Sequence, residues 1–403
     1  MSELGHFERL RPLIADLVRH GLPTHVFTDQ RFARSVESAG ATFVDLFEGR
    51  PLASVDDESI PLSCRSVTFA GACAESVAAE VERLGPAVVV YDTFAVVAHV
   101  VARLLGLPYV NVCNGHNYDP ARFVPVLERE YPRLSPSAAC LRAVELLRER
   151  YGVEDASPLS FVSGLSPYLN VYCEPPEFLT AAERQAFEPV AFYGSLAPPE
   201  ELEVPPGPSP FGDREGLRVY ASFGTVVRRH WNDQALAALA AVAAAVGGRP
   251  GTCGLISLGA PEPSAEVVDA LARERVSVVG RVDQHRALHD ADVFVTHQGL
   301  SSTHEAIYYL TPMLSYPFFA DQPGLAARCR DLGVALPLVD TPLAPVDEEA
   351  VAAALERVVA RREEMALRLV EARQWELDVI ARRRSVVERI VGLVGSEPEN
   401  EPA

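Results

Sequence analysis

The sequence predicts an α/β protein built from two β-α-β halves. Three observations support this prediction: compact apolar runs alternate with amphipathic segments, a proline-rich acidic stretch at 198–216 interrupts the alternation, and the alternation then restarts. Such alternation is typical of parallel sheets whose two faces are covered by helices. At 403 residues the chain is also long for one ordinary core.

The first half begins with a helical pattern, in which apolar residues from Phe7 to Leu17 repeat at helical spacing and Gly21 closes the helix. The expected elements that follow are a strand at 24–28, a helix from about 31, a strand at 41–47, a helix at 74–84, a strand at 87–92, a helix at 96–105 and a strand at 108–112. The pattern then loosens at 114–168, with helices expected near 124–131 and 138–151. Inserts at the carboxyl edge of a sheet commonly shape a pocket.

A strand ahead of Leu4 is missing from this pattern. In a doubly wound sheet the first strand lies centrally, so its loss would expose the edges of both neighbours. We therefore expect Met1 to lie downstream of the natural start, with about 10–15 further residues in the natural protein.

The second half repeats the alternation. Strands are expected at 217–223, 253–257, 276–279 and 292–296, helices at 233–246 and 284–289, and two long final helices at about 348–370 and 373–394. The expected organisation is a first domain at 1–197, a linker at 198–216, a second domain at 217–375, a crossing helix at 376–395 and a disordered tail at 396–403.

Composition argues against several functional classes. All 36 basic residues are arginine, which excludes a phosphate-binding or Schiff-base lysine, and the net charge of −19 argues against nucleic acid or an anionic membrane as partner. The seven cysteines form no CxxC pair, so we expect reduced, buried thiols and no zinc site. No apolar run reaches the roughly 18–20 residues of a membrane span. We expect a cytoplasmic monomer or homodimer without a metal or other cofactor.

The most informative stretch is 296–305. His297 and Gly299 stand where a buried strand must turn, and Ser301 and Ser302 open the following helix. A helix start offers bare backbone N–H groups and the positive end of the helix dipole. The stretch therefore predicts a site for an anion such as a phosphate.

Other polar residues end strands of the same half. Glu305 lies one turn into the helix, and the acid–amide pair Asp321 and Gln322 follows the next strand. Ser222-Phe-Gly-Thr225 ends the first strand of this half, where small residues let the backbone approach a diphosphate. The carboxyl ends of parallel strands meet at one edge of a sheet, so these groups predict one site for a sugar nucleotide.

Each motif also has a plain structural interpretation. The segment Ser222–Thr225 fits an ordinary strand-to-helix turn, and His297 fits a turn histidine bonded to backbone. Ser302 and Glu305 fit a capping box. Asp321 fits a helix N-cap followed by proline. Their order on consecutive strand-to-helix junctions favours the ligand site.

Four ordered motifs resemble the donor site of family 1 glycosyltransferases, the group that includes bacterial macrolide and natural-product glycosyltransferases and the UDP-sugar transferases. They are Gly280-Arg-Val-Asp-Gln284, His297-Gln-Gly-Leu-Ser-Ser-Thr-His-Glu305, Pro312 and Asp321-Gln322. The resemblance implies the GT-B fold, in which two Rossmann-like domains face each other across a cleft and the last helix returns to the N-terminal domain.

The resemblance implies a donor-binding set that comprises Ser222, Thr225, Arg281, Val282, Gln284, His297, Gly299, Ser301, Ser302, Glu305, Asp321 and Gln322. In it, Gln284 and Glu305 contact the nucleoside. His297, Ser302 and Thr225 hold the diphosphate, and the Asp321–Gln322 pair binds the sugar hydroxyls.

Two positions of the donor set depart from the family pattern. Arg281 replaces an aromatic residue that stacks on the base, and a guanidinium plane can stack instead. Ser301 replaces the family's common asparagine, which removes an amide donor near the phosphates.

The resemblance also implies a catalytic pair in the first half. The family's base is a histidine that follows a glycine, which matches His6, and its carboxylate partner matches Asp92. An imidazole can remove the proton of an acceptor hydroxyl near neutral pH, and a buried carboxylate would orient it. The plain alternatives are a solvated terminal histidine and a cap for the helix after Asp92.

The resemblance thus implies an inverting, metal-independent transfer of a hexose from a UDP- or TDP-sugar to a hydroxyl of a small apolar acceptor, such as a natural product. The residues expected on the acceptor side are His116, Phe123 and Tyr131. Two alternatives stay open: a sugar-nucleotide 2-epimerase of the same fold, and a non-catalytic partner protein.

Overall fold

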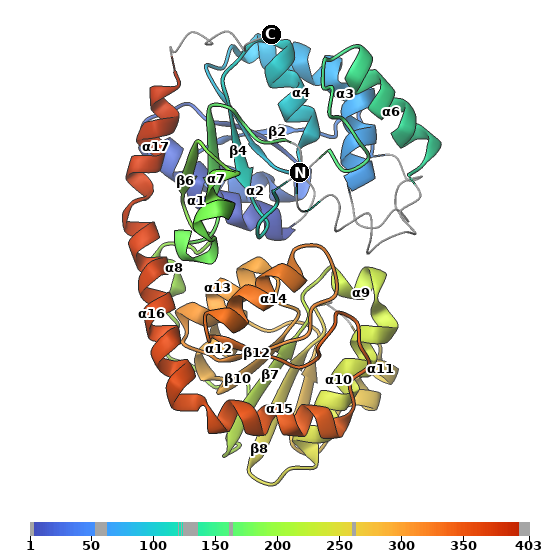
Figure 1. Cartoon of the computed structure of the whole chain (residues 1–403), viewed down its shortest axis with the longest axis vertical. Helices are drawn as coiled ribbons and strands as arrows, with labels where there is room; N and C mark the ends of the chain where they lie inside the picture. Colours follow the sequence, from blue (N-terminus) through green and yellow to red (C-terminus); the bar gives the residue numbers. More distant parts are fainter. Residues whose placement is uncertain are drawn as a thin grey trace. The chain divides into compact units, whose positions relative to one another are not determined.

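A computed structural model describes residues 4–52, 63–119, 121, 123, 136–160, 164–259 and 263–394. The chain divides into two compact units, shown with their elements in Figure 1. Unit 1 comprises Met1–Ser195 and Val379–Ala403, and unit 2 comprises Leu196–Asp378. Both units combine parallel strands with helices.

Unit 1 holds its described strands in two parallel sheets, of order β1-β2 and β3-β4-β5-β6. The strands are β1 (His25–Thr28), β2 (Thr42–Asp45), β3 (Val89–Asp92), β4 (Tyr109–Cys113), β5 (Leu169–Tyr172) and β6 (Val190–Phe192). The register pairs Asp92 with Val112 and Cys113 with Tyr172. The carboxyl ends of β3, β4 and β5 therefore meet at one edge of the sheet.

The helices of unit 1 are α1 (Leu4–Arg19), η1 (Gln30–Phe32), α2 (Ala33–Ser38), α3 (Ser63–Leu84), α4 (Val96–Leu104), α6 (Ala138–Glu149), η3 (Pro176–Phe178), α7 (Ala181–Gln185) and α17 (Arg383–Gly392). Helices α3, α4 and α6 pack together, whereas α1 packs against α2 and α17. The stacked rings of Phe7 and Phe32, with centroids 4.3 Å apart, anchor α1. Gly21 has a φ of 85° and follows the last turn of α1, as predicted.

Several predictions concern segments outside the described residues. They are the strand missing ahead of Leu4, the helix near 124–131 and the disordered tail at 396–403.

Unit 2 contains a six-stranded parallel sheet of order β12-β11-β10-β7-β8-β9. Its strands are β7 (Leu217–Ser222), β8 (Thr252–Ser257), β9 (Val276–Val279), β10 (Val293–Thr296), β11 (Met313–Ser315) and β12 (Ala335–Pro337). The strand order reverses between β7 and β10, because β8 and β9 extend the sheet on one side and β11 and β12 on the other. That reversal defines the topological switch point of the sheet.

The helices of unit 2 are α8 (Pro199–Leu202), α9 (Val227–His230), α10 (Asn232–Gly247), α11 (Ala265–Leu271), α12 (Gln284–Asp290), α13 (Leu300–Tyr308), α14 (Gln322–Asp331), α15 (Glu348–Ala360) and α16 (Arg362–Ala381, of which 379–381 belong to unit 1). Helix α10 packs on β7, β8 and β9, and α15 packs on α10. Helices α12 and α13 pack together, against β7 and β10 respectively. Helix α8 lies inside the stretch predicted as a linker.

The final helices differ from the sequence prediction. The chain forms α15, α16 and α17, with breaks at Arg361 and Arg382, instead of two helices separated near 371. Neither break contains glycine or proline, which are the residues that mark a helix end in a sequence. The prediction therefore placed the break in the middle of α16.

The cysteines and the membrane-span prediction are the two composition-based expectations that the described residues address. All seven cysteines are free, and all but Cys73 are buried. Within the described part of the chain, no helix combines the length and apolar character that a membrane crossing requires.

Candidate active site

Ser222 and His297, two of the residues predicted to bind a donor, lie at or next to the strand ends that form the switch point of unit 2. The register pairs Ser222 of β7 with Thr296 of β10, so the turns that follow these strands begin at the same level. Open α/β sheets bind ligands outside the carboxyl ends of the strands at such a point.

Three glycines allow the turns after β7, β8 and β10 to approach the His297 ring and one another. A Cβ atom at Gly299 would lie 2.3 Å from His297 Nε2, and one at Gly224 would lie 3.0 Å from the same atom. A Cβ atom at Gly259 would lie 2.2 Å from the carbonyl oxygen of Gly224. Gly224 and Gly259 also have φ angles of 71° and 67°, which favour glycine. Larger residues at these three positions would disrupt the turns.

His297 is a neutral imidazole at the centre of these turns. Burial lowers the pKa of His297 to about 4, although a hydrogen bond with the Ser222 backbone opposes that shift. That bond is the one expected of a turn histidine. The Nδ1 atom, in contrast, is buried and has no hydrogen-bond partner among the described residues. A buried unpartnered nitrogen calls for a further partner, which a ligand would provide.

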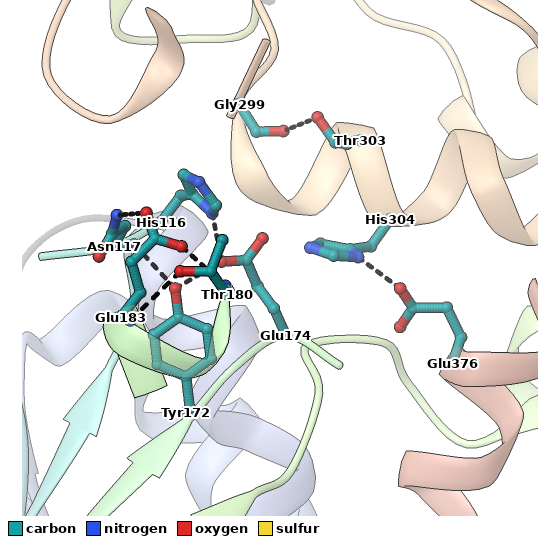
Figure 2. Close-up of polar contacts among 10 residues, drawn as sticks. All are labelled: His116, Asn117, Tyr172, Glu174, Thr180, Glu183, Gly299, Thr303, His304 and Glu376. Atoms are coloured by element: carbon teal, nitrogen blue, oxygen red, sulfur yellow. Dashed lines mark hydrogen bonds and ion pairs between the residues drawn. The ribbon is translucent and has the colours of Figure 1, made fainter. Parts of the chain in front are cut away.

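Helix α13 starts at the same point. It begins at Leu300, with Gly299 as its N-cap, and no side chain caps it. The hydroxyl of Thr303 donates to the Gly299 carbonyl oxygen at 3.0 Å and closes the first turn (Figure 2). The capping box considered for Ser302 and Glu305 is therefore absent. The N–H groups of the first turn have no partner within the helix, as at any helix start, and can serve an anion.

Helices α12 and α13 bring Gln284, Ser302 and Glu305 together. Gln284 Nε2 donates to Glu305 Oε2 at 2.5 Å and to Ser302 Oγ at 3.1 Å, and the Tyr220 hydroxyl donates to Gln284 Oε1 at 3.4 Å. Burial raises the pKa of Glu305, while the charge of His285 and the hydrogen bond from Gln284 lower it; the net pKa is above the ordinary value. The carboxylate thus has a neutral amide as its hydrogen-bonding neighbour.

The predicted sugar-binding pair lies at the start of α14. Asp321 occupies the N-cap position, as the structural interpretation predicted, but its side chain makes no capping hydrogen bond. Gln322 is buried, and its Oε1 accepts from the backbone N–H groups of Phe318 at 2.9 Å and Phe319 at 3.3 Å. The oxygen of Gln322 therefore shapes the 318–322 turn.

The other predicted donor residues are less buried. Thr225 and Arg281 are exposed, and Val282 and Ser301 are half-buried. A ligand at the carboxyl edge of the sheet has access to them.

Unit 1 brings the two predicted catalytic residues into contact. His6 Nδ1 lies 2.9 Å from Asp92 Oδ2, with 17% of the His6 side chain and 2% of the Asp92 side chain exposed. The ring of Phe94 meets the His6 ring edge-on, with centroids 4.6 Å apart. His6 is therefore held in place rather than solvated. Asp92 is not a helix cap, since α4 has Ala95 at its N-cap and no side-chain capping bond.

The electrostatic state of Asp92 follows from its partners. Burial raises the pKa of Asp92, but the charge of His6, together with hydrogen bonds from His6, the Asn114 amide and the Phe94 N–H, lowers it below the ordinary value. Asp92 is thus a buried carboxylate that stays ionised. Such a carboxylate can orient a histidine and stabilise its protonated form.

The predicted acceptor residues have different environments. His116 Nδ1 lies 2.9 Å from Glu174 Oε2, and both side chains are buried (Figure 2). Phe123 is buried and meets the ring of Tyr118 edge-on, with centroids 4.5 Å apart. Tyr131 lies outside the described residues.

Sequence reasoning missed two polar contacts. Asn114 donates to Asp92 Oδ2, and its place directly after β4, beside the end of β3, was a signal that could have found it. His304 Nδ1 lies 2.5 Å from Glu376 Oε1 with both side chains fully buried, which ties α13 to α16 (Figure 2). No local pattern marks that second pair. Among the described residues, no group of three or more His, Cys, Asp or Glu side chains is placed to hold a metal ion.

Solved structures identify the class of fold. The glycotransferase of kitacinnamycin superposes with a TM-score of 0.74 at 22% identity, over 97% of this chain and 96% of that one. CalG4, the calicheamicin glycosyltransferase, superposes with a TM-score of 0.72 at 21% identity, over 98% and 97%. The chain therefore has the GT-B fold, and the predicted fold class is confirmed.

Sequence comparisons find similarity to glycosyltransferases over part of the chain. The model of the UDP-glucoronosyl and UDP-glucosyl transferase family matches residues 211–372. Zeaxanthin glucosyltransferase of Pseudescherichia vulneris is 26% identical over 273 residues, which are 61% of this chain and 60% of that protein. Oleandomycin glycosyltransferase of Streptomyces antibioticus is 34% identical over 126 residues, which are 29% of each chain. Over residues 211–372 the chain is therefore similar to the family 1 glycosyltransferases, in agreement with the resemblance that its motifs predicted.

Proposed function

We propose that this protein is an inverting glycosyltransferase that moves a hexose from a UDP- or TDP-sugar to a hydroxyl of a small apolar acceptor. The family match and the glycosyltransferases among its relatives support the class of reaction. The observation that carries the proposal is the His6–Asp92 pair, because it supplies a base held by a buried, ionised carboxylate.

The proposal assigns the donor to unit 2. Glu305, held by Gln284, accepts hydrogen bonds from the ribose hydroxyls, and Arg281 lies flat against the base. The N–H groups at the start of α13 face the diphosphate, where they stabilise the charge that develops on the leaving group. The unpartnered Nδ1 of His297 takes up a proton beside the diphosphate charge and then donates to a diphosphate oxygen. Asp321 and the Gln322 NH₂ group bind the sugar hydroxyls.

The proposed reaction is a single displacement. His6 Nδ1 is engaged by Asp92, so Nε2 takes the proton of the acceptor hydroxyl. The acceptor oxygen forms a bond to the anomeric carbon as the bond from that carbon to the diphosphate oxygen breaks. The nucleoside diphosphate leaves with the electron pair, and attack from the opposite face inverts the configuration. Asp92 stabilises the imidazolium until the proton is released.

Aromatic rings next to His6 support an apolar acceptor. Phe94 contacts His6, Tyr118 lies 6.2 Å from Phe94 between ring centroids, and Phe123 follows Tyr118 at 4.5 Å. Rings of this kind bury apolar area and favour a flat or hydrophobic ligand.

Incubation of the purified full-length protein with UDP-glucose or TDP-glucose and a panel of aromatic and aliphatic alcohols tests the proposal. We expect equal amounts of glycoside and nucleoside diphosphate by mass spectrometry, and a β-glycoside from an α-linked donor by NMR. An epimerised donor formed without acceptor would support a 2-epimerase instead. Donor binding by calorimetry without turnover of any acceptor would support a non-catalytic protein.

A further inference from the structure

Asp92 is held at both of its oxygen atoms. Oδ1 accepts from the Phe94 backbone N–H at 2.8 Å. Oδ2 accepts from two side chains, His6 Nδ1 at 2.9 Å and the Asn114 amide. The buried Asn114 therefore shares one carboxylate oxygen with the histidine that the proposed function makes the base.

The orientation of the Asn114 amide is itself fixed. The thiol of Cys173 donates to Asn114 Oδ1 at 3.0 Å. Burial raises the pKa of Cys173 to about 12, so its sulfur keeps the proton that it donates. Because the oxygen of the amide faces a donor, its NH₂ group faces the carboxylate.

The loop that carries Asn114 is anchored by the end of β5. The Tyr172 hydroxyl accepts from the Asn117 backbone N–H at 2.8 Å, and Glu174 Oε2 contacts His116 Nδ1 at 2.9 Å. With the Cys173 contact, three consecutive residues of β5 and its extension hold three positions of one loop, and Figure 2 shows the two outer contacts.

A second anchor comes from α7. Asn117 Nδ2 donates to Glu183 Oε1 at 2.9 Å, and the other oxygen of Glu183 accepts from the Thr180 backbone N–H at 2.7 Å (Figure 2). Glu183 and Thr180 form the capping box of α7, so the loop is bonded to a fixed helix start.

We propose that Asn114 is a positioning residue for the His6–Asp92 pair. Its amide fixes the Asp92 carboxylate so that Oδ2 receives the Nδ1 proton of His6, which leaves the lone pair of Nε2 for the acceptor hydroxyl. His116, Tyr172, Cys173 and Glu174 act through Asn114 by holding its loop. The inference rests on the proposed function, in which His6 is the base.

Two matched variants test the role of Asn114. Asn114→Ala removes the amide next to Asp92, whereas Asn111→Ala removes another buried amide of the same strand segment, which bonds Asn170 at 3.2 Å and Thr93 at 3.0 Å instead. Four quantities are measured in both: kcat, KM for the donor, the histidine tautomer by ¹⁵N NMR of the resting protein, and the pH profile of the Asp92 carboxyl by ¹³C NMR. The tautomer is read without turnover, so it tests the positioning even if transfer is never observed.

We expect Asn114→Ala to lower kcat by about tenfold or more, as when a partner that orients a functional histidine is lost, with KM for the donor unchanged. The population of His6 that carries its proton on Nδ1 should fall. The pH profile of the Asp92 carboxyl, followed by ¹³C NMR, should move to higher pH, because Asp92 loses a bond that lowers its pKa. Asn111→Ala should leave the tautomer and the pH profile unchanged.

Two further variants keep the test decisive. Asn114→Asp preserves the shape but replaces the donor by a second carboxylate, so it should lose more activity than Asn114→Ala. If Asn114→Ala does not fold, Cys173→Ala removes only the thiol that orients the amide and should give a smaller shift of the same tautomer. The proposal would be overturned if folded Asn114→Ala kept the wild-type His6 tautomer and pH profile. If Cys173→Ala has to replace Asn114→Ala, the same result in Cys173→Ala would overturn it. If the wild type transferred no sugar but the Asn114 variant still showed the tautomer shift, only the proposed function would be overturned, and the positioning role of Asn114 would stand.

Discussion

Asp92 in unit 1 and Glu305 in unit 2 are carboxylates in buried surroundings whose pKa values move in opposite directions. Burial raises the pKa of each, but His6, Asn114 and the Phe94 N–H reverse that effect at Asp92. At Glu305 the charge of His285 and the amide of Gln284 do not reverse it, and the pKa ends above its ordinary value. The number and charge of the partners decide the direction.

The two carboxylates therefore differ in how many of their oxygen atoms accept hydrogen bonds from the protein. Asp92 has donors on both oxygens in the resting protein, as a group that orients a base requires. Glu305 has the amide of Gln284 on Oε2, so a ligand with hydroxyl donors would improve its environment. This contrast agrees with a fixed catalytic pair in unit 1 and a site in unit 2 that is completed by the donor.

Replacement of the base gives the largest expected effect. His6→Ala should lower kcat by about 10²- to 10⁴-fold, the range for general base catalysis, and should leave donor affinity by calorimetry unchanged. His20→Ala, an exposed histidine just after the same helix, is the control and should behave as the wild type. Retained transfer in His6→Ala would contradict the assignment of the base.

Replacement of Glu305 should act on binding instead. Glu305→Gln removes a charged acceptor worth about 1.5–3 kcal/mol, so the donor Kd should rise by about tenfold or more. The raised pKa also predicts a pH effect: as pH falls, Glu305 gains its proton at a higher pH than an ordinary glutamate, and donor affinity falls there.

Calorimetry across the acidic range checks this pH effect. Glu305→Gln should flatten the profile, while His6→Ala should keep it. A wild-type affinity that is independent of pH down to the ordinary range of a glutamate would contradict the role of Glu305.

The glycines around His297 predict an intermediate effect. Gly299→Ala places a Cβ atom 2.3 Å from His297 Nε2, so the ring must move. Overpacking of this kind costs about 1 kcal/mol or more, which should weaken donor binding by about fivefold or more. Gly207→Ala is the control, because its Cβ atom would meet its nearest neighbour at an ordinary 3.6 Å. Equal donor affinities of the two variants would argue against a role for the His297 turn.

Arg281 should give the smallest effect. An exposed guanidinium stacked on a base contributes about 0.5–1 kcal/mol, so Arg281→Ala should raise the Kd of UDP or TDP by only about two- to fivefold. Arg281→Trp should restore the affinity if stacking is the interaction. Arg273→Ala, at another exposed arginine, should change nothing. A Trp variant weaker than the Ala variant would exclude stacking.

The sequence predicted what local patterns encode. The alternation of strands and helices, the turn at His297 and Gly299, and the residues at strand ends follow from short-range periodicity and turn chemistry, and the His6–Asp92 pair followed from the family resemblance. The helix breaks at Arg361 and Arg382 were missed because no glycine or proline stands there.

Contacts between residues far apart in the sequence were the second feature that the sequence did not predict. The thiol that orients Asn114 is 59 positions away in sequence, and the partner of His304 is 72 positions away. A single sequence gives no sign of which distant polar residue will meet a given side chain. Whether Ser302 caps α13 likewise depended on where the helix begins, and the N-cap position belongs to Gly299 instead.

The His304–Glu376 pair has a consequence for recombining this protein with its relatives. Removal of one partner of a buried hydrogen-bonded pair costs about 1–3 kcal/mol, because the other polar group is left unsatisfied. A chimaera that takes α16 from another glycosyltransferase would keep His304 one residue before Glu305 and could lose Glu376. Crossover points for such chimaeras should therefore exchange 304 and 376 as one unit, even though 72 positions separate them.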